Sequence, residues 1–403
     1  MTEDISIRDR LARGPAVWAL SASMTLIYST IYYNYSGLIL FWLNDPGWSK
    51  VLLAAGPMLA QLIAALMAPF CGRQVDRGRG PEMLMIGPVL GAAALVALAF
   101  ITAPWQWIAV WGVIGVAQAL CFYEVGFAFL IRRLGPAARA AIIRVTLVAG
   151  FASTIAFPTY AALGNGPGWR VATLWAAALT LVTVVPLNFY ATWSIRREAP
   201  PPLKSPQSHA GEIPTAQSSR RAMILLILVS ASCSMNHWMI VTYIVPILVA
   251  KGYSTALAVT MGACLGPAQV LSRLGLMWAG NRVSNHRGVM ILLTLMLLAS
   301  AALVAASAGL VFAVIYVGCQ GAAFGAMTIL RPGLIADVMG PENYGANAGK
   351  ILMPTLFAGA MAPMIGAILL ENMGFEALAL LSLILLGTAL LALHRLKLAS
   401  RQG

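Results

Sequence analysis

The sequence predicts an all-α membrane protein with 12 transmembrane helices in two six-helix bundles. The 403-residue chain is 60% hydrophobic and only 10% charged, whereas soluble domains carry roughly 25% charged residues. Its mean hydropathy is +0.82. Apolar segments of about 20 residues, the length that one membrane crossing needs, recur from end to end of the chain. These observations exclude a soluble globular protein.

Six apolar segments form the first predicted bundle, residues 1–194. Each is long enough to cross the hydrocarbon core as a helix, and polar, Pro/Gly or Arg-rich breaks separate them. They occupy residues 16–43, 48–71, 82–103, 105–131, 140–163 and 169–193.

Six further segments form the second predicted bundle, residues 222–403. They occupy residues 222–250, 255–279, 288–308, 310–331, 346–370 and 375–394. Residues 195–221 between the bundles are rich in Pro, Ser and Gln and lack the apolar side chains that a core requires. We therefore expect a cytosolic linker there.

The two halves repeat each other weakly. The loop after the second segment reads GRQVDRGRG (72–80), and the loop after the eighth reads GNRVSNHRG (280–288), with the same Gly, Val, Arg and Gly at a shift of 208 residues. A Gly-Pro pair recurs at 56–57 and 266–267. Two parallel repeats with the substrate pathway at their interface follow from this pattern.

The basic residues predict the orientation of the chain. If the N-terminus is cytosolic, all 26 Lys and Arg except Lys50, Arg170 and Lys251 lie on the cytosolic side or near cytosolic helix ends. The positive-inside rule therefore places both termini in the cytosol. The formal charge of +13 comes mostly from Lys and Arg between the apolar segments, where they orient the chain against the lipid surface. We therefore expect no nucleic-acid partner.

The five cysteines form no CxxC pair and no cluster with histidine. The sequence also lacks a strand-to-helix glycine loop for nucleotide phosphates and any nucleophile–base pair. We therefore expect no metal, no cofactor and no enzymatic activity.

Short motifs resemble those of the major facilitator superfamily. Gly72, Asp76 and Arg77 match its Gly-x-x-x-Asp-Arg loop signature, although the Gly and Arg that follow stand one place early. Gly-Trp-Ser at 47–49, Gly-Trp-Arg at 168–170 and GPAQVLSR at 266–273 resemble the branch that contains monocarboxylate and oxalate/formate transporters. The resemblance implies a monomeric secondary transporter, and with it a bacterial cytoplasmic (inner) membrane.

The sequence also departs from related patterns. The fourth segment has Trp111 where proton-coupled members commonly have Arg, and the fifth lacks the Gly-Pro pair of drug/proton antiporters. In the eighth segment, Gln269 stands where monocarboxylate carriers have the Asp of Asp-x-x-x-Arg, while Arg273 is kept. These departures weaken an assignment to drug efflux without excluding it.

Ionisable side chains at membrane depth are candidates for substrate binding, because each costs about 2.5 kcal/mol or more unless it has a partner, an aqueous cavity or a function. Arg273 lies some seven residues before the end of its segment and offers a planar fork that matches a carboxylate. Arg144 is a second candidate. Lys350 resembles the intramembrane Lys of oxalate/formate exchangers with a spacing that differs by one. The alternative for Arg273 is a structural role at the cytosolic gate. The alternative for Lys350 is that its ammonium group extends to the cytosol.

Glu124 and His237 are the candidate proton carriers. Glu124 is an acid within an apolar segment, and it either titrates or pairs statically with Arg144. His237 has an unperturbed pKa near 6.5, and it either contacts substrate and protons or forms a hydrogen bond between helices.

Two further groups complete the prediction. Tyr32 and Asn34 belong to a polar and aromatic group in the first segment that either binds substrate or packs between helices. The Gly72, Asp76 and Arg77 loop is expected to act as a gate.

The sequence thus predicts a carrier that moves a small, monocarboxylate-like organic anion by alternating access, with proton symport as the candidate coupling. The alternatives are an efflux carrier for a drug or toxic metabolite and a membrane sensor with the same fold.

Overall fold

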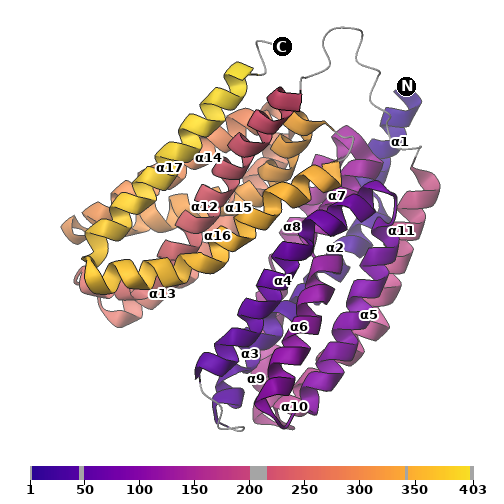
Figure 1. The fold of residues 1–403 in the computed structure, drawn as a ribbon, viewed down its shortest axis with the longest axis horizontal. Coiled ribbons are helices and arrows are strands. Elements are labelled where there is room, and N and C mark those ends of the chain that lie inside the picture. Colours follow the sequence, from indigo (N-terminus) through magenta and orange to yellow (C-terminus); the bar gives the residue numbers. More distant parts are fainter. Residues whose placement is uncertain (1, 45–49, 200–215, 341–343, 400–403) are drawn as a thin grey trace. The chain divides into compact units, whose positions relative to one another are not determined.

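The computed structural model describes residues 2–44, 50–199, 216–340 and 344–399, and the regular elements in these ranges are helices. The chain divides into two compact units, and Figure 1 shows their helices coloured along the sequence. Unit 1 consists of Met1–Lys204 and Pro341–Lys350, and unit 2 consists of Ser205–Gly340 and Ile351–Gly403. The motif at 47–49 and residues 200–215 of the expected linker lie outside the described residues.

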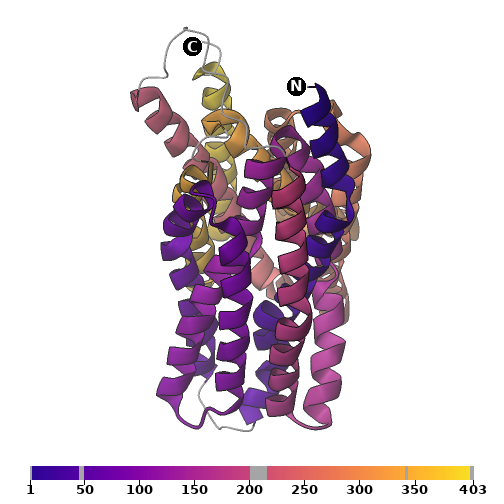
Figure 2. The same cartoon turned by 90° about the vertical axis from the view of Figure 1, so that its right-hand side faces the viewer.

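Unit 1 is a bundle whose helices run alongside one another, with the N-terminal helix at one end (Figures 1 and 2). Its helices are α1 (Thr2–Arg13), α2 (Pro15–Ile27), α3 (Tyr33–Asn44), α4 (Lys50–Asp76), α5 (Gly80–Ala99), α6 (Pro104–Cys121), α7 (Tyr123–Leu134), α8 (Ala138–Ala149), α9 (Ala152–Asn165), α10 (Trp169–Leu179) and α11 (Val185–Glu198). Single π-helical turns join α2 to α3 (Tyr28–Tyr32) and α10 to α11 (Thr180–Val184).

Unit 2 has fewer and longer helices. They are α12 (Ala216–Ala250), α13 (Thr255–Ala279), α14 (Asn285–Val304), α15 (Leu310–Met339), α16 (Tyr344–Asn372) and α17 (Gly374–Ala399). The first residues of α16 belong to unit 1 and the rest to unit 2. Because α11 ends at Glu198 and α12 begins at Ala216, helix extends into both ends of the expected linker at 195–221.

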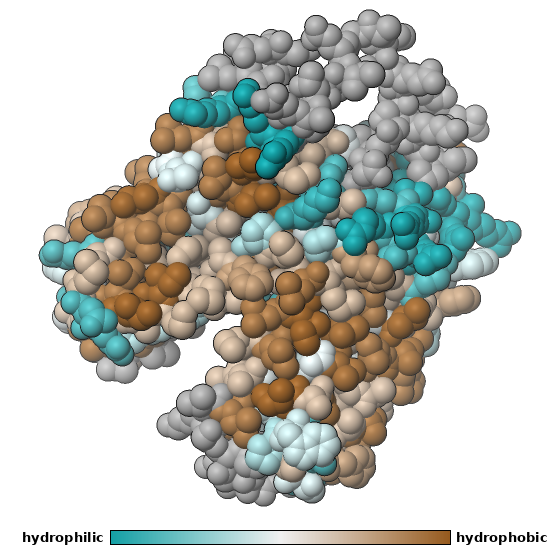
Figure 3. All heavy atoms as spheres, in the orientation of Figure 1, coloured by the Kyte–Doolittle hydropathy of each residue, from teal (hydrophilic) through white to brown (hydrophobic). Residues whose placement is uncertain are grey.

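The described helices are long and apolar enough for a membrane protein. Nine stretches of the described residues qualify as candidate spans, and one of them, Pro104–Asn165, is 62 residues long, more than twice what one crossing needs. This is consistent with the 12 expected crossings. Large apolar side chains such as Leu66 (61% exposed) and Leu271 (67%) lie on the outside. Figure 3 shows apolar side chains along the helices and polar side chains gathered at helix ends.

Close contact between α13 and α15 fixes the inner frame of unit 2. A Cβ atom at Gly321 would lie 2.8 Å from the carbonyl oxygen of Leu265, and one at Gly325 would lie 2.6 Å from the Cα of Gln269. Only glycine permits this approach, because a larger residue would push the two backbones apart. The contact therefore fixes the spacing between α13 and α15.

Candidate functional site

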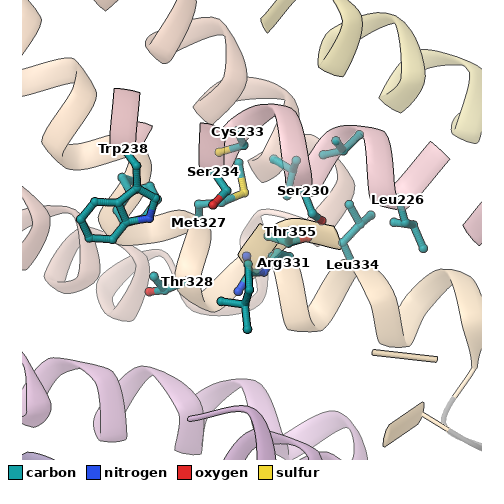
Figure 4. Close-up of a pocket in the computed structure, with 14 residues that line it drawn as sticks. Leu226, Ser230, Cys233, Ser234, Trp238, Met327, Thr328, Arg331, Leu334 and Thr355 are labelled. Carbon is teal, nitrogen blue, oxygen red and sulfur yellow. The ribbon is translucent and has the colours of Figure 1, made fainter. Parts of the chain in front are cut away.

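A cavity of about 120 Å³ lies within unit 2, between α12, α14, α15 and α16. Its lining residues recur every three or four positions on α12 and on α15, which is the spacing of one helix face. Figure 4 shows Trp238 at one end of the row and Leu226 and Leu334 at the other, with Arg331 and Thr355 between them. The lining consists of Leu226, Val229, Ser230, Cys233, Ser234, Trp238, Val289, Phe324, Met327, Thr328, Arg331, Leu334, Thr355 and Leu356.

Arg331 is the charged residue of this lining. It lies eight residues before the end of α15 at Met339, about 12 Å into the helix at 1.5 Å per residue. Its guanidinium makes no hydrogen bond or ion pair within the ranges that the structure describes. An acidic side chain is not among the lining residues. The cavity therefore carries a positive charge that an anion could balance.

Four hydroxyl groups also line the cavity. Ser230 is 3% exposed and Ser234 is 8% exposed, and neither hydroxyl has a hydrogen-bond partner among the described residues. The Thr328 and Thr355 hydroxyls donate to the carbonyl oxygens of Gly325 and Ile351, each at 2.7 Å. The serine hydroxyls are thus available as donors to a bound oxyanion.

Arg331 is not among the site residues that the sequence predicts, because Arg331-Pro332-Gly333 looks like the end of a crossing. The segment expected at 310–331 in fact continues as helix to Met339, with Pro332 in the helix interior. This extension places Arg331 in the interior of α15 rather than at the boundary that the sequence predicts. A charged residue within one or two turns of a predicted helix end is the signal that could have identified it.

Aromatic side chains form the end of the cavity that lies away from the two leucines. The Phe324 and Trp238 rings lie 6.2 Å apart, nearly perpendicular at 78°. On its other side Phe324 stacks on His237, with ring centroids 3.3 Å apart and an interplanar angle of 2°. Phe324 therefore lines the cavity and also packs against the buried His237.

His237 lies behind the cavity wall and is not one of the lining residues. It is 3% exposed, and its Nδ1 is 3.2 Å from Nε2 of Gln320. Next to it, the Asn236 amide donates to the Ser382 hydroxyl at 2.5 Å, so polar contacts join α12 to α15 and α17. The geometry corresponds to the helix-linking alternative for His237.

Arg273 also lies outside this cavity. It is 8% exposed, and its Nε donates to the carbonyl oxygen of Gly325 at 3.4 Å, across the contact between α13 and α15. The same carbonyl accepts the Thr328 hydroxyl. Arg273 is therefore placed to support the cavity wall, and its predicted contact with substrate stays a prediction.

In unit 1, two irregular helix segments meet at aromatic side chains. The π-helical turn carries Tyr28 and Tyr32, and Phe122 has extended backbone (φ −83°, ψ −173°) that breaks the expected 105–131 crossing into α6 and α7. The Tyr28 ring lies 4.4 Å from that of Phe122 and 4.5 Å from that of Tyr123. Glu124 follows in the first turn of α7, and it is exposed.

Tyr32 belongs to this aromatic group, with its ring 6.3 Å from that of Phe122. Asn34 lies apart from it and is fully buried. Its amide donates to the Tyr160 hydroxyl at 3.3 Å, which ties α3 to α9. Arg144 donates to the carbonyl oxygens of Ala12 at 3.1 Å and Ala140 at 2.9 Å, so it joins α8 to the N-terminal helix. These contacts are those of residues that pack helices together.

The predicted gating loop contacts the start of α16 within unit 1. The Asp76 carboxylate accepts the backbone N–H groups of Gly345 at 2.8 Å and Ala346 at 2.7 Å. Gly72 touches the carbonyl group of Gly345, a contact that leaves no room for a side chain. Arg77 and Lys350 are exposed. A carboxylate at a helix N-terminus is favourable because it satisfies free N–H groups and opposes the helix dipole.

No group of three or more His, Cys, Asp or Glu that could hold a metal ion is found in the described part of the chain.

Comparison with known proteins agrees with this fold. The family profile of the Major Facilitator Superfamily matches residues 21–319. Among solved structures, the chain is similar to the crystal structure of "a Major Facilitator Superfamily (MFS) transporter, FucP, in the outward conformation", with a TM-score of 0.69 and 13% identity over 96% of this chain and 99% of the other. No curated protein matches the sequence. The chain is not an enzyme but a membrane transport protein, and it belongs to the Major Facilitator Superfamily.

Proposed function

We propose that this protein is a secondary transporter that moves a small organic anion, of the monocarboxylate class, by alternating access. The observation that supports this is Arg331, a permanently charged guanidinium in a cavity that has no acidic lining residue. A single carboxylate balances one guanidinium and fits its planar fork. The two unpaired serine hydroxyls, Ser230 and Ser234, supply further donors.

The energetics favour a charged substrate. A charged side chain at membrane depth costs about 2.5 kcal/mol or more, and an anion recovers part of this cost when it binds. An uncharged substrate would leave the cost in place. Efflux of an apolar drug or toxic metabolite is the second candidate, because Trp238, Phe324 and Met327 supply an apolar wall.

Uptake of labelled monocarboxylates into proteoliposomes tests the proposal. Arg331→Gln removes the charge but keeps polar atoms, and we expect at least about 30-fold slower uptake, since truncating one partner of a buried charge pair costs 2 kcal/mol or more. Arg287→Gln, at an exposed arginine of α14, is the matched control and is expected to transport normally. Equal uptake by wild type and Arg331→Gln contradicts the assignment of Arg331.

Proton symport through Glu124 is the coupling that we propose. Glu124 lies in the first turn after the break at Phe122, and non-helical backbone at membrane depth is tolerated where it is buried or lines a cavity. Substrate and coupling-ion sites of transporters are commonly built at such broken helices. In Glu124→Gln, uptake should no longer respond to an imposed pH gradient, while exchange of labelled for unlabelled anion continues. Glu371→Gln, at an exposed acid of α16, serves as the control.

The proposal includes a monomer in the cytoplasmic (inner) membrane, with both termini in the cytosol. Supporting contacts gather arginines of three helices at one end of unit 1, where Arg8 donates to the carbonyl oxygen of Arg133 at 2.8 Å and Arg133 donates to that of Arg196 at 2.5 Å. Basic helix ends face the cytosol. A Ser6→Cys variant in a cysteine-free background should react with a membrane-impermeant thiol reagent only after the cells are permeabilised.

A further inference from the structure

We propose that the anion carries a single aromatic ring, so that the substrate is a small aryl carboxylate with its carboxylate at Arg331 and its ring against Trp238 and Phe324. This inference rests on the proposed transport of organic anions and specifies the part of the substrate that Arg331 does not bind.

The first argument is the division of the cavity into polar and aromatic parts. Arg331 lies toward the leucine end with Ser230, and Ser234 lies between Ser230 and Trp238 (Figure 4). Phe324 lies seven residues before Arg331 on α15, two helical turns or about 10 Å along the axis. The arginine side chain spans part of this distance. A carboxylate joined to one ring spans the remainder, whereas a carboxylate with a one- or two-carbon chain would leave the aromatic end unfilled.

The second argument is that the aromatic wall is held in place before any substrate binds. Phe324 stacks on His237, and His237 is fixed in turn by Gln320. Trp238 packs closely against α16, where a Cβ atom added at Gly359 would lie 3.0 Å from its Cδ1. A ring that enters this space meets two rings whose orientation is already set, which lowers the ordering cost of binding.

The third argument is size. A buried cavity of about 150 Å³ lined by apolar residues accepts a benzene ring, and this cavity measures about 120 Å³. The volume is therefore of the order that one ring needs, and two fused rings need more. Edge-to-face and stacked ring pairs add to the gain from apolar burial, so the aromatic wall should favour an aryl ring over a saturated one by up to about tenfold.

The test is a competition panel with the full-length wild-type protein in proteoliposomes. Labelled benzoate is the transported probe, and unlabelled benzoate, cyclohexanecarboxylate, acetate and benzyl alcohol are the competitors. We expect benzoate to compete best, cyclohexanecarboxylate up to about tenfold less well, acetate least among the acids, and benzyl alcohol not at all. Acetate that competes as well as benzoate overturns the inference, and so does cyclohexanecarboxylate that competes better.

Variants separate the ring contact from the anion contact. In Trp238→Leu the preference for benzoate over acetate should fall about tenfold, and residual uptake of either acid shows that the variant folds. Trp278→Leu, at a tryptophan of α13 that is 84% exposed, is the matched control and should keep the wild-type preference. An unchanged preference in Trp238→Leu contradicts the assigned ring contact.

The proposed function and this inference fail in different ways. Uptake of acetate and benzoate at equal rates, both abolished in Arg331→Gln, leaves the anion carrier standing and removes the aryl specificity. Failure of wild-type protein to bind or transport any carboxylate removes both, and it favours efflux of uncharged or cationic compounds.

Discussion

At the scale of single residues, the part of the site that sequence analysis missed is the part with the clearest chemistry. Arg273 was predicted to lie at membrane depth and to bind substrate, whereas Arg331 fell at the end of the predicted segment 310–331. The structure places Arg273 between helices and Arg331 in a cavity. Hydropathy cannot distinguish these two positions. The distinction depends on how far α15 continues past Pro332 and on which helix face each side chain occupies. Depth and direction are tertiary properties.

Gly359 is predicted to set the width of the cavity. A Cβ atom there would lie 2.8 Å from the Ser234 hydroxyl and 3.0 Å from Cδ1 of Trp238, so Gly359→Ala must displace one of these side chains. We expect benzoate uptake to fall about tenfold and acetate uptake to change little. Gly387→Ala on α17 is the control, because its added Cβ would meet no atom within 4 Å. If both variants transport benzoate normally, the cavity wall is more adaptable than its contacts indicate.

His237 is predicted to act as a positioning residue. Its ring supports Phe324 from behind, so His237→Leu removes a flat stacking partner and frees the phenylalanine to rotate. The ratio of benzoate to acetate uptake should drop several-fold, with the response to a pH gradient unchanged. His394→Leu, at an exposed histidine of α17, is the control. Loss of the pH response in His237→Leu would instead assign proton transfer to this residue.

At the scale of helices, periodic hydropathy predicted which segments are helical but not where they break. The interruption at Phe122 has no Gly or Pro at Cys121-Phe122-Tyr123 to announce it, and the π-helical turn at Tyr28–Tyr32 has none either. Both irregular segments depend on the tyrosine and phenylalanine rings that pack between them. Such breaks are decided by contacts between helices, which a single sequence does not display.

Asp76 is predicted to stabilise the junction between α4 and α16. Its carboxylate accepts two backbone N–H groups at the start of α16, so Asp76→Ala should lower the free energy of unfolding by about 1 kcal/mol, the usual cost of losing a helix cap. Asp76→Asn should lose less. Thermal unfolding in detergent measures both, and Asp9→Ala, at an exposed acid of α1, is the control. Equal stability of the Asp76 and Asp9 variants would mean that water replaces the carboxylate without cost.

At the scale of the whole molecule, the sequence was sufficient to predict the fold class and the family. The excess of apolar residues and the recurring apolar segments of about 20 residues predicted bundles of membrane helices, and the loop at 72–80 indicated the family. The weak repeat is also informative where its two copies differ. Asp76 of the first copy binds the start of α16, whereas in the second copy Ser284 caps α14 and Asn285 donates to Asp337 at 2.9 Å. The same loop position thus carries different contacts in the two copies.

The whole transport cycle is predicted to be electrically neutral. Arg331 keeps its charge throughout, so the moving charges are the carboxylate of the substrate and a proton carried by Glu124, and their sum is zero. A carboxylate that crosses alone would carry one negative charge, and a membrane potential of 100 mV acts on one charge with about 2.3 kcal/mol, or roughly 40-fold in accumulation. Benzoate accumulation should therefore follow an imposed pH gradient and ignore a potassium diffusion potential. Accumulation that follows the potential instead means that the anion moves without its proton, and Glu124 would then serve structure rather than coupling.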